Sequence, residues 1–171
     1  HATGEYAQPW VYLHAIKDYS DMAAHLENHP KVRAVVNFTP VLLDQLEDYA
    51  DQFAAGRFRD PLLRLLAHPD LYRLDAAERD LVLRRCFKAN HQKMIEPYPA
   101  YRRLWDLYTL TQQPGTAGES YLSAQYLGDL LTWYHLAWVG ETVRRRDQPV
   151  PKLLAKAQTF SHVARMQRVE L

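Results

Sequence analysis

Residues 32–56 read VRAVVNFTPVLLDQLEDYADQFAAG and contain the sharpest change of pattern in the chain. The first seven, Val32–Phe38, are mostly apolar, rich in β-branched side chains and bounded by prolines, which predicts a strand. Thr39 and Pro40 then suit an N-cap and a first helical position. Apolar residues at helical spacing follow as far as Gly56, where we expect the helix to end.

Helical patterns dominate the sequence on both sides of this strand. We expect helices over Val11–Asn28, after Asp60-Pro61, after the Asp75 and Glu78 capping pair, over Pro99–Tyr108, after Ser123 as far as Gly140, after Pro149 and after Thr159. The predicted fold is therefore mainly α, one domain over 1–171 with about seven helices and one orphan strand. A single strand cannot satisfy its own backbone hydrogen bonds. We therefore expect Val32–Phe38 to pair with other chain or with a second copy of itself.

Composition narrows the classes of function. The 171 residues are 47% hydrophobic and 24% charged, and 21 basic side chains against 20 acidic ones give a formal net charge of +1. This balance gives no electrostatic reason to expect nucleic acid or an anionic membrane as a partner. No apolar run has the length needed to span a bilayer. The single cysteine, Cys86, excludes an internal disulfide framework and favours the cytoplasm.

No recognised cofactor motif is present, so we expect no cofactor. The sequence contains no glycine-rich phosphate loop, no nucleophile elbow, no zinc-ligand spacing and no pair of carboxylates that stands out as an acid/base dyad. The basic cluster Arg144–Arg146 is expected to follow the end of a helix, where cations suit the helix dipole.

Four polar side chains share one face of the first predicted helix. His14, Asp18, Asp21 and His25 lie at i, i+4, i+7 and i+11. One interpretation is a metal site, since imidazoles and carboxylates are its usual ligands. The favoured interpretation is a solvated polar face with a His–Asp hydrogen bond, because ligands four apart on one helix supply only part of a coordination shell.

Three residues are candidates for ligand contact. Asn37 lies where the predicted strand ends and a helix begins, the position at which α/β folds gather functional groups; a tolerated polar residue is the equal alternative. Trp10 precedes the first helix and is less constrained by its periodicity. His14 follows one turn later. The aromatic side chains of Trp133, Tyr134 and Trp138 favour a core face, with a stacking platform for sugar rings as the alternative.

Four stretches, in order and together covering most of the chain, resemble one family. They are PWVYLHAIKDY at 9–19, the strand with TPVLLDQLEDY at 39–49, FKAN with MIEPYP between 87 and 99, and WYHLAWVG at 133–140. The chain resembles the N-terminal part of the catalytic domain of glycoside hydrolase family 57, which comprises α-amylases and 4-α-glucanotransferases.

The resemblance implies a specific fold and activity. The catalytic domain would be an incomplete (β/α)7-type barrel in which Val32–Phe38 is the second strand and about 61–171 is a helical insertion. Asn37 would then lie at the active-site rim, with Trp10 and His14 nearby. The family acts on α-glucans with retention, using a Glu nucleophile and an Asp general acid on later strands. Neither the motif that carries the Glu nucleophile nor the motif that carries the Asp general acid is present in this sequence, so the chain is expected to be inactive by itself.

Two other functions remain open from the residues alone. The first is a non-catalytic helical interaction module, dimeric through its orphan strand. The second is a metal-binding helical protein that uses His14, Asp18 and His25. For the interpretation as a glycoside hydrolase, the sequence distinguishes neither hydrolysis from transglycosylation nor one glucan from another.

Overall fold

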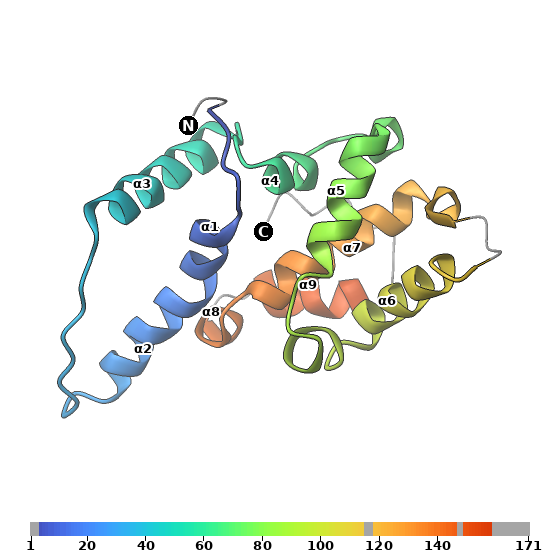
Figure 1. The fold of residues 1–171 in the computed structure, drawn as a ribbon. Coiled ribbons are helices and arrows are strands. Elements are labelled where there is room, and N and C mark those ends of the chain that lie inside the picture. The colour runs from blue at the N-terminus through green and yellow to red at the C-terminus, as the bar shows by residue number, and fades with distance from the viewer. Residues whose placement is uncertain (1–3, 115–117, 147–148, 159–171) are drawn as a thin grey trace. The chain divides into compact units, whose positions relative to one another are not determined.

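The computed structural model describes residues 4–114, 118–146 and 149–158. Within this part of the chain every regular element is a helix (Figure 1), which confirms the prediction of a mainly α fold. The described residues divide into two compact units. The first unit contains 4–64 and 138–146, and the second contains 65–137 and 149–158. No helix among the described residues is long and apolar enough to cross a membrane.

The first unit opens with a helix that is continuous but not uniform. α1 (Trp10–His14) passes into η1 (Ala15–Tyr19), a single π-helical turn, and then into α2 (Ser20–Asn28). The prediction of a helix over Val11–Asn28 is confirmed. The π-helical turn is a local widening of the backbone, a feature that often occurs at functional sites.

The prediction of a strand at Val32–Phe38 is wrong for the residues that the structure describes. These residues form the uncoiled stretch between α2 and α3 (Figure 1), and all seven are exposed. Val35 is 102% exposed and Phe38 is 59% exposed. A strand exists only through hydrogen bonds to a neighbouring strand. The described residues contain no neighbouring strand. The composition of this stretch gives it β propensity, but that propensity leads to a strand only where the side chains can pack against neighbouring strands.

The next helix agrees with the sequence at both ends. α3 (Pro40–Ala55) has Thr39 at its N-cap and Pro40 in its first turn. It ends at Gly56, whose φ of 63° lies in the left-handed region that favours glycine. α3 contacts α1 through the rings of Tyr12 and Tyr49, whose centroids lie 5.5 Å apart. Both rings are almost fully buried.

A buried carboxylate begins the following helix. Asp60 is 1% exposed and accepts hydrogen bonds from the backbone N–H groups of Leu62, at 2.8 Å, and Leu63, at 3.2 Å. It thereby caps α4 (Pro61–Leu66), as the Asp-Pro pair predicts. The Tyr49 hydroxyl also donates to Asp60, at 3.4 Å.

The last element of the first unit was not predicted from sequence. α8 (Glu141–Arg146) is a six-residue helix that begins directly after Gly140 and packs against α2. Arg144–Arg146 follow the end of α7 (Ala124–Trp138), as expected, but they also form the last turn of α8, which the sequence did not predict. Their side chains still lie near a helix C-terminus, where positive charge is favoured.

The second unit is built from longer helices around an aromatic core. Its main elements are α5 (Ala76–Cys86), η3 (His91–Ile95), α6 (Pro99–Thr111), α7 (Ala124–Trp138) and α9 (Pro149–Gln158), with shorter 3-10 turns at η2 (Leu71–Arg73) and η4 (Gly118–Tyr121). The capping box of Asp75 and Glu78 and the cap from Ser123 are confirmed. The helix predicted after Thr159 lies outside the described residues.

Candidate functional site

Trp10, His14 and Trp138 meet in the first unit and form what we call the aromatic cluster. Trp10 and His14 lie one turn apart on α1, and Trp138 ends α7. The Trp138 ring centroid lies 5.9 Å from that of Trp10 and 5.7 Å from that of His14, the latter pair nearly edge to face. Trp10 is 42% exposed and Trp138 is 7% exposed. Trp138 therefore supports a Trp10 ring that faces solvent.

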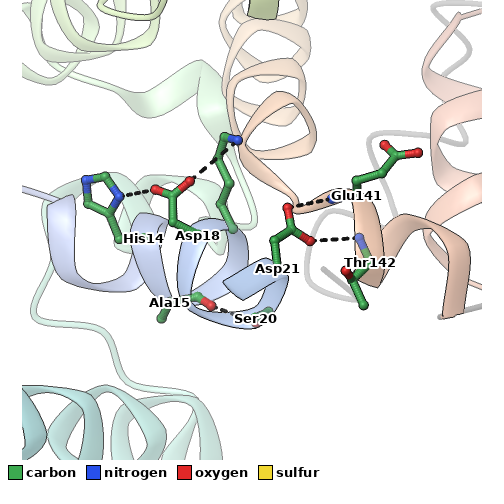
Figure 2. A network of polar contacts seen from close by, with 8 residues as sticks. His14, Ala15, Asp18, Ser20, Asp21, Glu141 and Thr142 are labelled. Carbon is green, nitrogen blue, oxygen red and sulfur yellow. Dashed lines mark hydrogen bonds and ion pairs between the residues drawn. The ribbon is translucent and has the colours of Figure 1, made fainter. Parts of the chain in front are cut away.

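A polar pair lies beside the aromatic cluster. His14 Nδ1 contacts the Asp18 carboxylate one turn further along the helix (Figure 2). Lys17 Nζ lies 3.7 Å from the same carboxylate. His14 and Asp18 are 38% and 47% exposed at their side chains. The His–Asp hydrogen bond that the sequence favours is confirmed. Both groups remain accessible to a ligand.

This arrangement combines one flat apolar face with charged hydrogen-bonding groups. An exposed indole ring can stack on the C–H face of a sugar ring. The Asp18 carboxylate can accept hydrogen bonds from hydroxyl groups, and the imidazole of His14 can donate or accept. The chemistry of the site therefore suits a neutral, polyhydroxylated ligand with flat apolar faces.

The other two polar residues of this helix face do not join the site. The Asp21 carboxylate accepts hydrogen bonds from the backbone N–H groups of Thr142, at 2.8 Å, and Glu141, at 3.1 Å (Figure 2). It thereby caps α8 instead of pointing toward His14. His25 lines a small hollow of about 240 Å³ beside α8. Among the described residues, no group of three or more His, Cys, Asp or Glu side chains is arranged to hold a metal ion.

The hydrogen bonds at Asp21 change its acidity. Partial burial alone raises the pKa of this carboxyl, but the N–H donations from Thr142 and Glu141 and the charge of Lys17 outweigh that effect. The pKa of Asp21 consequently lies below its ordinary value of 3.8. Asp21 is therefore ionised at neutral pH, the state in which it caps a helix best.

Asn37 is not brought to the aromatic cluster. It lies in the open stretch between α2 and α3, exposed, and its side chain makes no hydrogen bond to any described residue. Among the described residues, Asn37 therefore has no buried structural contact. Its role toward a ligand stays a prediction.

The aromatic residues of α7 have two roles: Trp138 belongs to the aromatic cluster, whereas Trp133 and Tyr134 are core residues. Trp133 and Tyr134 are each 1% exposed, and Trp133 stacks on Tyr101 with a centroid distance of 6.3 Å. They belong to the core of the second unit, as their helical spacing predicts.

Cys86 is fully buried in the same unit, and burial raises the pKa of its thiol. It is packed, and burial disfavours the thiolate that a nucleophile needs.

Sequence reasoning missed two features. One is the role of Asp21 and Gly140 in joining the first helix to α8; an aspartate within a helix and a glycine at the end of another carry no local signal that they meet. The other is an apolar hollow of about 710 Å³ in the second unit, between α6, η4 and α7. Leucine side chains line much of it, among them Leu104, Leu107 and Leu110.

Comparison with known proteins adds no relative: no family model, no curated protein and no solved structure matches the chain.

Proposed function

We propose that the chain is the N-terminal part of the catalytic domain of a retaining glycoside hydrolase or transglycosylase that acts on α-glucans, of the family 57 type. In this proposal Val32–Phe38 is the second barrel strand and residues from about 61 onward are the helical insertion. The catalytic carboxylates belong to a part of the enzyme that is not in this sequence. The 171-residue chain is then inactive alone.

The observation that supports this proposal best is the open stretch between α2 and α3. It follows α2, which packs against α8, and it precedes α3, which contacts α1 through the buried rings of Tyr12 and Tyr49. Yet it exposes Val32, Val35 and Phe38 at 56%, 102% and 59%. A β-branched apolar run that is flanked by packed helices and itself unburied is what a parallel barrel strand presents when its neighbouring strands are missing.

The aromatic cluster supplies the second support. A half-exposed Trp10 ring backed by Trp138, with the His14–Asp18 pair beside it, provides a stacking face and hydroxyl partners on the helix that precedes this stretch. In the proposed enzyme Trp10 and His14 contact the glucan from one side. Asn37, at the carboxyl end of the strand, contacts it from the barrel rim.

The first test is turnover by the purified chain. Incubation with maltoheptaose should release no new reducing ends and produce no longer oligosaccharides, because two opposed carboxylates are required for the retaining mechanism. An α-amylase serves as the positive control for the assay. Turnover that is lost on substitution of a residue within 1–171 would contradict the proposal.

The second test is binding without turnover. Titration of maltoheptaose should change the tryptophan fluorescence of the chain, and Trp10→Ala should abolish the change. Trp105→Ala is the matched control, because Trp105 lies on α6 in the second unit, outside the aromatic cluster. Cellohexaose, whose β-linked chain is straighter, should bind more weakly. Equal responses of the two variants would contradict a substrate role for Trp10.

The second candidate function is an interaction module that dimerises through residues 32–38. Its support is the self-complementarity of this stretch in antiparallel pairing centred on Val35. In that register Arg33 lies opposite Asn37, so no like charges meet, and Val32 lies opposite Phe38, a favourable β-branched and aromatic pair. Open apolar edges of this kind favour association.

Sedimentation separates the two candidates. A dimeric module should dissociate to monomers in Val35→Asp and remain dimeric in Val41→Asp. Val41 is a fair control because it is 67% exposed but belongs to α3. A chain that is monomeric at all concentrations would exclude the module and leave the enzyme proposal unaffected.

A further inference from the structure

A short segment after α7 is tied to the first helix at three points. The Gly140 N–H donates to the Ile16 carbonyl at 2.9 Å, and the Asp21 carboxylate accepts from the next two N–H groups, those of Glu141 and Thr142. These contacts join residues about 120 positions apart in the sequence. We call them the Asp21–Gly140 junction.

The junction leaves no room for a side chain at position 140. A Cβ atom on Gly140 would lie 2.9 Å from Asp21 Oδ1 and 2.9 Å from the Lys17 carbonyl oxygen. The second of these is backbone and cannot move by rotating a side chain. Glycine is therefore required here by close approach rather than by an unusual φ angle.

The carbonyl that accepts from the Gly140 N–H lies within the π-helical turn. Over Ala15–Tyr19 the helix is wider than an α-helix, and the Ser20 hydroxyl donates to the Ala15 carbonyl at 2.9 Å (Figure 2). In such a turn the regular hydrogen-bond ladder is displaced, and individual carbonyls become available to other donors. The Ile16 carbonyl belongs to this turn and accepts a hydrogen bond from the Gly140 N–H.

The junction also sets the position of the aromatic cluster. Trp138 lies only two residues before Gly140, so the three backbone contacts at Gly140, Glu141 and Thr142 restrict where its ring can lie. The same π-helical turn lies between His14 and Asp21. The contacts of the Asp21–Gly140 junction therefore set the distance from Trp138, at the end of α7, to Trp10 and His14 on α1.

We infer that Asp21 and Gly140 are positioning residues for the ligand-binding face: they hold Trp138 behind Trp10 and His14 and so keep the Trp10 ring oriented for stacking. This inference rests on the proposed function only for the nature of the ligand. The geometric coupling between the junction and the aromatic cluster stands on the contacts themselves.

The first experiment measures the coupling without any ligand. The chain has four tryptophans, so labelling with 5-fluorotryptophan gives four ¹⁹F resonances, each assigned by a single Trp→Phe variant. Asp21→Ala and Gly140→Ala should shift or broaden the Trp10 and Trp138 signals and leave those of Trp105 and Trp133 in place. Unchanged Trp10 and Trp138 signals would overturn the inference.

A matched control separates positioning from the loss of any helix cap. Asp75→Ala removes the cap of α5 in the second unit, where the Glu78 N–H donates to Asp75 at 2.8 Å. It should lower stability without moving the Trp10 and Trp138 signals. If Asp21→Ala fails to fold, Asp21→Asn takes its place: the amide oxygen still accepts one N–H, and smaller shifts of the same two signals are expected. Shifts of all four signals in either variant would count against a local positioning role.

The second experiment uses maltoheptaose as the probe. Gly140→Ala should weaken its binding to the chain by about fivefold or more, the lower range of coupling between linked sites, while Asp75→Ala should not. If Gly140→Ala shifts the ¹⁹F signals of Trp10 and Trp138 but leaves the affinity for maltoheptaose unchanged, the functional part of the inference is overturned. If the unsubstituted chain binds no sugar but the signals still shift, the proposed function fails and the positioning of Trp138 stands.

Discussion

At the scale of single residues, His135 shows how burial sets the state of a side chain. It is 3% exposed in the second unit, and its Nδ1 donates to the Leu131 carbonyl at 2.7 Å. Burial lowers the pKa of His135 and the hydrogen bond to the Leu131 carbonyl opposes this effect, and the net result is a fall from 6.5 to about 4. The imidazole is therefore neutral at physiological pH and belongs to the core.

The lowered pKa of His135 predicts acid sensitivity. Between pH 6.5 and about 4 the unfolded chain binds a proton at this residue and the folded chain does not. The free energy of unfolding should thus fall as the pH drops through this window, by about 1.4 kcal/mol per pH unit from this residue. Urea unfolding of the unsubstituted chain and of His135→Asn measures the difference. Equal slopes in the two proteins would contradict the assignment.

Asn37→Ala distinguishes a ligand role from a structural one. Because the Asn37 side chain is exposed and makes no hydrogen bond to a described residue, its removal should change the stability of the chain by less than about 0.5 kcal/mol. In the complete enzyme that we propose, the same change should lower turnover. Thermal melting and steady-state kinetics measure both. A lower melting temperature with unaltered kinetic constants would reject the ligand role.

At the scale of elements, the helix ends are set by local chemistry. The Asp75 carboxylate accepts from the Glu78 N–H, and the Glu78 carboxylate accepts from the Asp75 N–H at 3.0 Å, which completes a capping box at the start of α5. Gly56 ends α3 with a positive φ angle. Because each device spans four residues or fewer, it can be recognised without any knowledge of the tertiary structure.

The capping box predicts a measurable effect on α5. Asp75→Ala should lower the free energy of unfolding by about 1 kcal/mol, the usual effect of losing an N-cap. Asp51→Ala is the control, because Asp51 is an exposed acid in the interior of α3 and caps nothing. Its substitution should change stability by less than about 0.5 kcal/mol. Denaturant unfolding measures both, and similar losses in the two variants would contradict the role of the cap.

At the scale of the whole molecule, burial divides apolar residues into two kinds. Leu130, on α7, is 0% exposed within the core of the second unit, whereas Val35 is 102% exposed in the open stretch of the first. Both are apolar, and composition does not distinguish them. Only the packing of helices around α7, and its absence around residues 32–38, separates their contributions to stability.

This contrast predicts opposite outcomes for two similar truncations. Leu130→Ala should lower the free energy of unfolding by about 2–5 kcal/mol, since it removes buried methyl groups and leaves a cavity. Val35→Ala should leave it within about 0.5 kcal/mol in dilute solution. Urea unfolding at low protein concentration measures both. A large loss in Val35→Ala would mean that the stretch is buried, and would contradict the open conformation.

The sequence by itself determined the helices whose ends carry local signals. Side-chain caps at Asp60, Asp75 and Ser123 and the stop at Gly56 lie where the residues predict them, because capping and left-handed φ angles depend on a few neighbouring residues. Thr39 lies at the predicted N-cap position of α3, but its side chain makes no capping hydrogen bond. The sequence also predicted a His–Asp hydrogen bond on the first helix, and His14 and Asp18 make it, since residues four apart on a helix are neighbours.

Only the tertiary structure decided the features that depend on distant residues. Val32–Phe38 has strand composition but forms no strand in the described chain, because the hydrogen bonds of a strand must come from a partner. The short helix α8 was not predicted, because its cap is Asp21, about 120 residues earlier. For the same reason the meeting of Trp10 with Trp138 was not predicted: contacts at such separation depend on how helices pack, and local pattern does not encode that.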